Sequence, residues 1–467
     1  MSLEKILVRA LNRHQRQRST RCGGLSAGYA EPLVGGTPGE FSLPVSPPQH
    51  TFLCGRTGKG KTTLLLRLME EHLRSNIPFV FVDFHGHATN DLLAMVASRP
   101  QDRRVILLEP WADPVIGWNP IETNGESPYP IVQELIAIFH RRLWPDAWGP
   151  RLEELLRMTL LALAQARLTL LEVTSFLSRP EFRRAILRRV TIPEVREFWS
   201  VRFEHLSPSQ RALVTEAVLN KMSVFHDPAL KYVVGQHRST LDVDVVVEGD
   251  HTLIADFSAG NLRGNNHLLA ALLVAQLKTA IYRRPPKAKP RSLFLDEFQE
   301  LVALETLDDY LRSFRKFRCS VYLATQHLQL APEIKAAIFG NCSRFIAFAT
   351  SAGDAAFLGR EFGSREGDLV ANILPDLPTG KAIVKVRGEP ARLLRVSPPE
   401  TRTTQVLVDA GRRSCLKLGR ARQEIEKEIE ERRLMLFPQG SAQSRKATKT
   451  QEEDIGANHV PEGYEKL

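Results

Sequence analysis

Residues 51–66 read TFLCGRTGKGKTTLLL and contain the pattern G-x-x-x-x-G-K-S/T at residues 55–62. A short apolar run precedes the pattern and a helix-forming run follows it, which is the order strand, glycine turn, helix. In such a turn, backbone N–H groups and the positive end of the helix face phosphate oxygens. The sequence therefore predicts a nucleoside triphosphate site. Its residues are Gly55, Arg56, Thr57, Gly58, Lys59, Gly60, Lys61, Thr62 and Thr63.

Within this loop, two side chains have expected roles of their own. Lys61 is expected to reach the β- and γ-phosphates, and the Thr62 hydroxyl is expected to bind Mg²⁺. The expected small-molecule ligands are thus ATP and Mg²⁺.

Two acids end a second apolar segment, RSLFLDE at residues 291–297. Asp296 is placed to hold Mg²⁺ through water, and Glu297 is placed to polarise the attacking water. An acidic pair after a strand can also cap a helix, but the upstream phosphate loop favours the catalytic interpretation. Gln326 ends the next apolar segment, residues 319–325, and can sense the γ-phosphate or orient water. An ordinary glutamine at a strand end is the alternative.

Composition limits the class of protein. The chain has 467 residues, of which 43% are hydrophobic and 25% charged, enough for two domains with tails. A net charge of +10 favours an anionic partner, although charge alone does not distinguish DNA, RNA and an acidic membrane. The five cysteines are scattered without a C-x-x-C pair, which indicates a reducing compartment and no zinc site.

Hydrophobic patterning predicts a split nucleotide-binding domain. No apolar window is long enough to cross a membrane, so we expect a cytoplasmic location, with recruitment to the inner face of the membrane as an alternative. Strands and helices alternate before and after a purely helical block, and a doubly wound, mostly parallel α/β sheet is expected. The predicted divisions are a basic arm and linker (1–37), the first core part (38–127), an all-α insertion (128–238), the second core part (239–400) and a charged helix with a disordered tail (401–467).

Smaller segments have narrower expectations. Residues 40–45 are expected to form an edge strand, and 379–396 a terminal hairpin. Residues 406–436 are expected to form one charged helix, either solvated or docked on a partner. The basic segment 4–21 is either a solvated tail or a contact for nucleic acid.

Several motifs together resemble the HerA/FtsK superfamily of ring ATPases. They are HTFLCG (50–55), VDFHGH (82–87), WNP (118–120), LDEFQ (295–299), RK (315–316) and ATQ (324–326). Within the superfamily, the chain is most similar to TraG/TraD-type coupling proteins of conjugative type IV secretion and their soluble relatives. The segments WGPR (148–151), FW (198–199), NK (220–221), GQ (235–236) and LD (241–242) resemble that family's all-α domain. The resemblance extends over about residues 38–400.

The resemblance implies a RecA-like P-loop NTPase core that forms a hexameric ring and hydrolyses ATP to move DNA through its centre. It gives the phosphate-loop residues, the acids Asp296 and Glu297, and the sensor Gln326 their family roles. It also implies a relaxase, secretion-channel or nuclease partner. Two features depart from the family: its Asp-Pro-His-Gly-Asp pattern ends here in His87, and coupling proteins commonly begin with transmembrane helices, so a soluble form is expected.

Arginines supply two further sets of candidates. Ring ATPases place an arginine from one subunit near the γ-phosphate of the next, and Arg344, Arg315 and Arg360 are candidates for this arginine finger. The basic run Arg312, Arg315, Lys316 and Arg318 is the candidate DNA contact through phosphates. A surface ion pair or a solvated helix face beside the acidic residues 308 and 309 is the alternative for these arginines.

The sequence favours a DNA-translocating ATPase that acts in conjugative DNA transfer. The alternatives are a secretion or assembly ATPase that acts on protein, and a HerA-like DNA-processing ATPase that works with a nuclease. A non-hydrolysing, nucleotide-gated adaptor is a different class, and the intact Lys61, Asp296 and Glu297 argue against it.

Overall fold

The computed structural model describes residues 24–33, 38–98, 104–146, 148–262, 264–298, 307–363 and 366–435. Its centre is an eleven-stranded sheet with the order β2-β1-β11-β10-β9-β3-β8-β7-β4-β6-β5. The strands are β1 (Gly24–Pro32), β2 (Gly39–Pro44), β3 (Thr51–Cys54), β4 (Phe79–Asp83), β5 (Arg104–Leu108), β6 (His251–Asp256), β7 (Arg291–Leu295), β8 (Cys319–Thr325), β9 (Arg344–Ala347), β10 (Lys381–Val386) and β11 (Arg392–Val396).

Seven of these strands, from β9 through β3 to β5, pair in parallel. The strands β10, β11, β1 and β2 continue the sheet in antiparallel pairs beyond β9. The mostly parallel α/β core predicted from the sequence is therefore confirmed, and the predicted hairpin near residues 379–396 is β10–β11.

Helices cover the two faces of the sheet because both faces are apolar. Consecutive side chains of a strand point to opposite faces, and Phe81 and Val82 of β4 accordingly belong to different hydrophobic clusters. One face packs against α2 (Lys61–Ser75) and α3 (His87–Ala97). The other packs against the remaining helices of the core: α11 (Val243–Glu248), α12 (Ala259–Leu262), α13 (Asn266–Arg283), α14 (Leu307–Ser313), η5 (Phe314–Phe317), α15 (Pro332–Asn341), α16 (Ala352–Phe362), α17 (Gly367–Ile373) and η6 (Leu374–Asp376).

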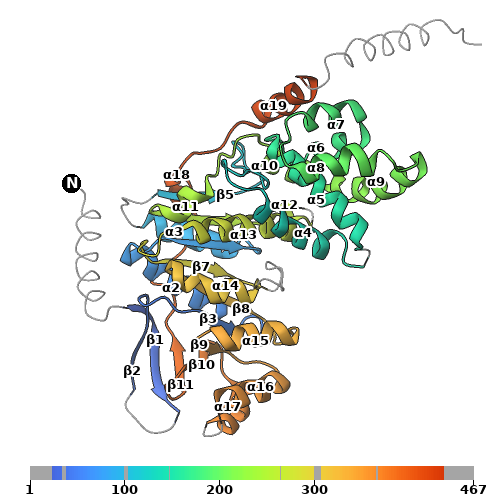
Figure 1. Cartoon of the computed structure of the whole chain (residues 1–467). Coiled ribbons are helices and arrows are strands. Elements are labelled where there is room, and N and C mark those ends of the chain that lie inside the picture. The colour runs from blue at the N-terminus through green and yellow to red at the C-terminus, as the bar shows by residue number, and fades with distance from the viewer. Residues whose placement is uncertain are drawn as a thin grey trace, which may run out of the picture.

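The all-α domain leaves the core after β5 and lies beyond the β5 end of the sheet (Figure 1). Proline, which is favoured at the first position of a helix, begins five of its helices. The helices are α4 (Tyr129–Leu143), α5 (Pro150–Gln165), α6 (Glu172–Ser178), α7 (Pro180–Leu187), α8 (Pro193–Glu197), η1 (Phe198–Phe203), α9 (Pro208–Met222), η2 (Ser223–His226) and α10 (Pro228–Val234).

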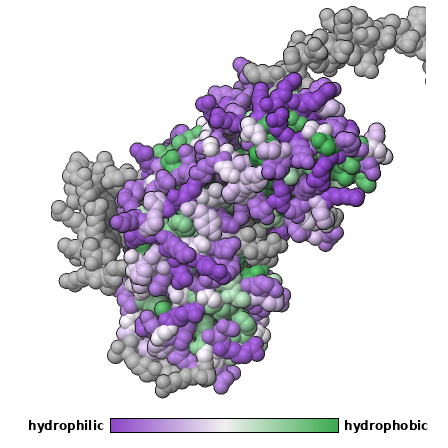
Figure 2. Space-filling model, viewed as in Figure 1, coloured by the Kyte–Doolittle hydropathy of each residue, from purple (hydrophilic) through white to green (hydrophobic). Residues whose placement is uncertain are grey.

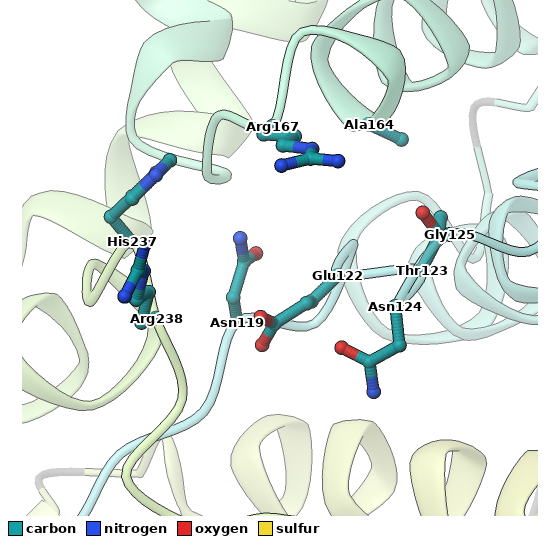
Figure 3. A pocket seen from close by; sticks show the side chains of 9 residues that line it. All are labelled: Asn119, Glu122, Thr123, Asn124, Gly125, Ala164, Arg167, His237 and Arg238. Atoms are coloured by element: carbon teal, nitrogen blue, oxygen red, sulfur yellow. The ribbon is translucent and has the colours of Figure 1, made fainter.

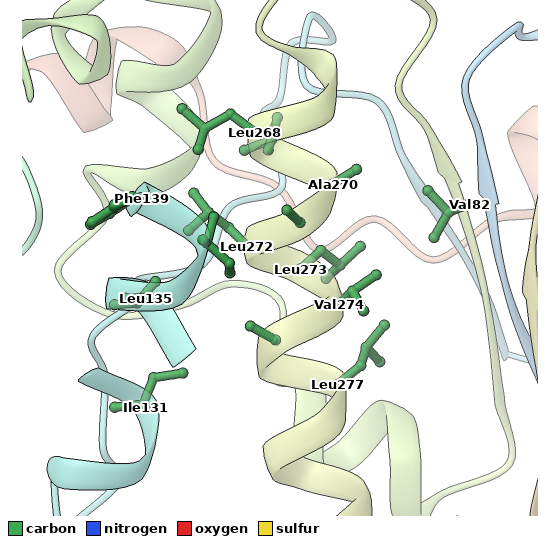
Figure 4. Packing of buried hydrophobic residues seen from close by; sticks show 14 of the residues in the cluster. Val82, Ile131, Leu135, Phe139, Leu268, Ala270, Leu272, Leu273, Val274 and Leu277 are labelled. Carbon is green, nitrogen blue, oxygen red and sulfur yellow. The ribbon is translucent and has the colours of Figure 1, made fainter. Parts of the chain in front are cut away.

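Helix α13 joins the two parts of the molecule. Figure 4 shows it between α4 of the all-α domain and Val82 of β4. Leu135 and Phe139 of α4 face one side, where Leu272 lies, and Leu277 lies on the side toward the sheet. A helix that is apolar on all sides is buried, and α13 has buried residues throughout its length.

The C-terminal segment forms two helices, α18 (Gln405–Ser414) and α19 (Arg422–Met435), so the prediction of one helix over 406–436 was wrong. Between them, Leu416 N donates to Val105 O of the edge strand β5 at 2.8 Å, and Arg420 and Val115 exchange two backbone hydrogen bonds. The segment between the two helices thus covers part of the β5 edge of the sheet, which is one way in which proteins protect an edge strand.

Both helices are docked on the rest of the chain. In α18, Gly411 meets α3 so closely that a Cβ there would lie 2.0 Å from Leu93 O. In α19, Glu426 pairs with Lys231 at 2.6 Å and Arg432 pairs with Glu172 at 3.0 Å, both partners being in the all-α domain. The C-terminal segment thus connects α3, the β5 edge and the all-α domain.

The predicted linker was also wrong in part. Residues 24–32 form β1, which pairs with both β2 and β11. The predicted edge strand near 40–45 is β2. The basic segment 4–21 and the predicted tail after 436 lie outside the described residues.

The face of the molecule in Figure 2 is mainly hydrophilic, with small, separate hydrophobic patches. Large exposed apolar side chains include Leu213 of α9 and Val406 of α18. Among the described helices, none combines the length and the apolar content that crossing a membrane requires.

Candidate nucleotide-binding site

The phosphate loop starts where β3 ends, between β8 and β9. Gly55 N donates to Thr325 O of β8 at 3.2 Å, and Arg56 N donates to Ala349 O just beyond β9 at 2.8 Å. Gly55 has a φ of 151°, and a Cβ there would lie 2.5 Å from the Cβ of Phe348. Glycine is therefore required at this position by the close approach of the neighbouring chain.

The centre of the loop leaves room for a ligand. Gly58 and Gly60 have φ values of 74° and 116°, a region in which glycine is favoured. A Cβ on Gly58 would meet no atom within 4 Å. Gly60 is also the N-cap of α2, so the positive end of that helix faces the loop. The open cradle and the helix end fit a phosphate group.

The Lys61 ammonium lies inside the loop. Its Nζ donates to Gly55 O at 2.6 Å and to Arg56 O at 3.3 Å, and the residue is buried. Burial lowers the pKa of Lys61, while the nearby Glu297 and Asp296 carboxylates act in the opposite direction. The two carbonyl oxygens accept hydrogen bonds from the Lys61 ammonium but do not neutralise its charge. The ammonium therefore fits a site that binds an anion.

The two predicted acids follow β7. Asp296 is 9% exposed, and burial, followed by the nearby Glu297 carboxylate, raises the pKa of Asp296 to about 6. Glu297 has a φ of 50°, and its N–H donates to Asp296 Oδ1 at 3.1 Å. Thr62 is exposed at the start of α2. Hydroxyl and carboxylate oxygens are the donors that Mg²⁺ prefers, so this donor set fits the ion.

Gln326 connects the acid to the phosphate loop. Its Nε2 donates to Glu297 Oε1 at 2.6 Å, and its Oε1 accepts from the Thr57 hydroxyl at 2.7 Å. A carboxylate can only accept, which fixes the orientation of the amide. The structure thus brings together residues that the sequence placed on three separate strand ends.

Two further acids lie at the same edge of the sheet. The Asp83 carboxylate accepts from the backbone of His85, Gly86 and Thr89 and from the Thr89 hydroxyl, so it fixes the start of α3. Burial raises the pKa of Asp256 to about 6, and the facing Asp83 adds to this effect. Asp256 was not among the predicted site residues, although its place at the end of β6 is a signal that could have indicated it.

The arginine-finger candidates have different positions. Arg344 is 1% exposed, donates to Pro44 O and aligns with Thr51 at the amino end of β3. It cannot reach a neighbouring subunit, so this candidate was wrong. Arg315 is exposed but lies in η5, before β8, at the sheet edge opposite to the phosphate loop. Arg360 is exposed on α16, which follows β9.

The candidate DNA contacts lie together at that opposite edge. Arg315 and Lys316 are exposed in η5, and Arg318 ends it with a φ of 56°. Arg312 pairs with Asp308 one turn away, as the solvated-face alternative expects. The cluster is therefore separated from the nucleotide site by the length of the strands.

Comparison with known proteins relates both sequence and fold to a family. Residues 196–364 match the model for "Type IV secretory system Conjugative DNA transfer". The predicted resemblance to conjugative coupling ATPases is confirmed. No curated protein matches the chain in sequence.

Solved structures of two proteins, TrwB and VirB4, share the fold. The unbound bacterial conjugative coupling protein TrwB has a TM-score of 0.56 and 17% identity, covering 84% of this chain and 92% of that one. TrwB with ADP and Mg²⁺ has a TM-score of 0.54 and 17% identity over 78% of this chain and 90% of that one. VirB4 of Thermoanaerobacter pseudethanolicus has a TM-score of 0.55 and 14% identity over 81% and 97%.

Proposed function

We propose that this coupling-family protein hydrolyses ATP and uses the energy to move DNA through a ring of its own copies. The observation that carries the proposal is the meeting of Lys61, Asp296, Glu297 and Gln326 at one phosphate loop. TrwB, which shares this fold, has been solved in complex with ADP and Mg²⁺ and with a non-hydrolysable ATP analogue, and this supports nucleotide binding here.

Binding is assigned to the loop and its lysine. The N–H groups of residues 55–63 and the N-terminus of α2 surround the phosphates, and the buried Lys61 ammonium neutralises their charge. Thr62 and Asp296 would hold Mg²⁺, which supplies positive charge against the phosphate oxygens. A cation beside Asp296 would favour its ionised form and so lower the raised pKa of this carboxyl.

Hydrolysis is assigned to Glu297. Its carboxylate orients a water molecule for attack on the γ-phosphorus and accepts a proton from that water, while the bond to the ADP oxygen breaks. In the structure, one Glu297 oxygen accepts from the Gln326 amide, which in turn accepts from the Thr57 hydroxyl of the loop. Gln326 therefore acts as a positioning residue that links occupancy of the loop to the acid.

An arginine from a neighbouring subunit would complete the site in a ring. Arg360 is exposed on a helix that follows β9, whose end lies next to the phosphate loop. Arg360 is accordingly the arginine-finger candidate that we keep. The basic side chains Arg315, Lys316 and Arg318 are proposed to contact DNA phosphates without reading sequence.

The first test is the rate of ATP hydrolysis with and without single- and double-stranded DNA. We expect stimulation by DNA in the wild type, and loss of hydrolysis in Lys61→Ala and in Glu297→Gln. Glu297→Gln keeps the loop and should still bind ATP, whereas Lys61→Ala should not. Glu389→Gln changes the charge equally at an exposed position and serves as the control.

The alternatives give different results in the same test. Vigorous hydrolysis by the wild type that DNA leaves unchanged, and that Lys61→Ala and Glu297→Gln both abolish, would favour a secretion or assembly ATPase that acts on protein. DNA-stimulated hydrolysis that rises further with a nuclease would favour a HerA-like DNA-processing ATPase. Absence of hydrolysis under all conditions would contradict the proposal.

A further inference from the structure

A cavity of about 290 Å³ lies where the chain enters and leaves the all-α domain. Three segments form its walls: residues 119–125 on the way in, Ala164 and Arg167 at the end of α5, and His237 and Arg238 on the way out. Figure 3 shows Arg167 on one side of the cavity, with Asn119, Glu122 and Asn124 opposite and His237 and Arg238 at one end. This volume is close to the lower limit of small-ligand pockets, about 300 Å³.

The walls are fixed to one another by hydrogen bonds. Asn119 N donates to the Ser239 hydroxyl at 2.9 Å, and Asn119 Nδ2 donates to Leu168 O at 2.9 Å. His237 N donates to Glu428 of α19 at 2.9 Å. Entry segment, α5 turn and exit segment are therefore held in place before any ligand arrives, which lowers the cost of binding.

Two arginines give the cavity its charge. Arg167 and Arg238 are exposed, and neither has an ion pair with a carboxylate among the described residues. Arg167 has a φ of 56°, in the left-handed region that a residue with a side chain rarely adopts. Arg238 lies between the anchored His237 and Ser239.

The wall also contains one carboxylate, Glu122, and no ion pair joins it to either arginine among the described residues. Glu122 Oε2 accepts from both the backbone N–H and the hydroxyl of Ser239, so this oxygen is already engaged. The cavity thus has cationic donors on two walls, and its two arginines outnumber the single carboxylate in its lining.

We propose that this cavity binds a phosphate group, held between the guanidinium groups of Arg167 and Arg238. Planar guanidinium groups match phosphate oxygens with paired hydrogen bonds. A phosphate here would connect the all-α domain to the segment that returns to the core. The group can belong to the backbone of nucleic acid or to a small phosphate compound, and only the first source rests on the proposed function.

The test uses the double variant Arg167→Gly/Arg238→Gln in the full chain. Glycine removes the guanidinium and accepts the left-handed backbone, so the variant should fold. Arg188→Gln/Arg189→Gln loses the same charge at exposed positions after α7 and is the matched control. Arg238→Glu alone repeats the test if the double variant unfolds.

In the first arm, binding of a labelled oligothymidylate is measured by fluorescence anisotropy at several salt concentrations without ATP. Each phosphate contact on a single strand contributes about 0.7 to the slope of log K against log salt. Loss of two contacts should lower that slope by about 1.4. A slope lowered in the site variant and unchanged in the control assigns the cavity to nucleic acid.

In the second arm, pyrophosphate is added to Lys61→Ala protein, in which the phosphate loop is disabled. A thermal unfolding midpoint that rises with pyrophosphate, and fails to rise once the two arginines are replaced, assigns the cavity to a small phosphate compound. If the site variant behaves as the control in both arms, the proposal is overturned. Neither arm requires ATP hydrolysis, so this failure is distinct from a failure of the proposed function.

Discussion

Gln326 shows how much of the nucleotide site depends on single residues. A strand-end glutamine is visible in the sequence, but its two hydrogen bonds, to Glu297 and Thr57, require β7, β8 and the loop to be adjacent. The residues Lys61, Asp296 and Glu297 could be predicted because each belongs to a short motif that can be recognised in the local sequence. The bridge between them was not predictable, since it depends on pairing of distant strands.

Replacing Gln326 with alanine should lower kcat for ATP hydrolysis about 10- to 100-fold, as is common for residues that orient a reacting group. ATP binding should change little because Lys61 and the loop N–H groups remain. Steady-state kinetics and nucleotide-binding measurements separate the two quantities. An unchanged kcat would contradict the proposed role of Gln326 in positioning Glu297.

His50 gives a prediction about pH. Burial lowers the pKa of His50 to about 4, and the neutral ring accepts from Val321 N at 3.0 Å through Nδ1 and donates to Leu311 O at 2.8 Å. In the unfolded chain the His50 ring takes up a proton near pH 6.5, whereas in the folded protein it does so only near pH 4. The contribution of His50 to stability is therefore present above pH 6.5 and is lost as pH falls toward 4.

The full shift of the His50 pKa corresponds to a loss of roughly 3 kcal/mol from the free energy of unfolding. The raised pKa values of Asp296 and Asp256 stabilise the folded protein as the pH falls through this range, which opposes the effect of His50. The effect of His50 is therefore measured as the difference between the wild type and a His50 variant. The unfolding free energy of the wild type should fall more between pH 7 and pH 5 than that of His50→Gln. Parallel pH profiles would contradict a neutral, buried His50.

At the scale of elements, the sequence predicted best what is locally patterned. Apolar runs marked most parallel strands, and helical spacing marked the all-α block. The strand β1 was missed because Gly28 interrupts its short apolar pattern of Leu25, Ala27 and Ala30, and because its partner β11 is distant in the sequence. The break between α18 and α19 was missed because the contact that accompanies it, from Leu416 to Val105 of β5, joins residues far apart in the sequence.

Two glycines test the packing of these elements in opposite directions. Gly411→Ala should destabilise the protein by about 1–3 kcal/mol, because the new Cβ would lie 2.0 Å from Leu93 O and force α18 away from α3. Gly340→Ala in α15 should stabilise it by about 0.4–1 kcal/mol, because no atom lies within 4 Å of that Cβ. Chemical denaturation measures both, and effects of the same sign would contradict the packing described.

For the whole molecule, the positive charge predicts a strong dependence on salt. With a net charge of +10, affinity for DNA that rests on phosphate contacts should fall as counterions compete. Arg315→Gln/Lys316→Gln should weaken binding equally for unrelated sequences and reduce the salt slope. Arg188→Gln/Arg189→Gln removes equal charge from the all-α domain and should have less effect. A sequence-dependent loss would contradict contacts to phosphates alone.

We propose that ATP hydrolysis at Lys61, Asp296 and Glu297 moves DNA. Displacement of a third strand from a DNA triplex, measured by fluorescence with ATP and Mg²⁺, tests for this movement. We predict ATP-dependent displacement by the wild type and none by Glu297→Gln, which still binds ATP. Rapid DNA-stimulated hydrolysis without displacement would contradict movement along DNA, and displacement by Glu297→Gln would contradict the assignment of the site.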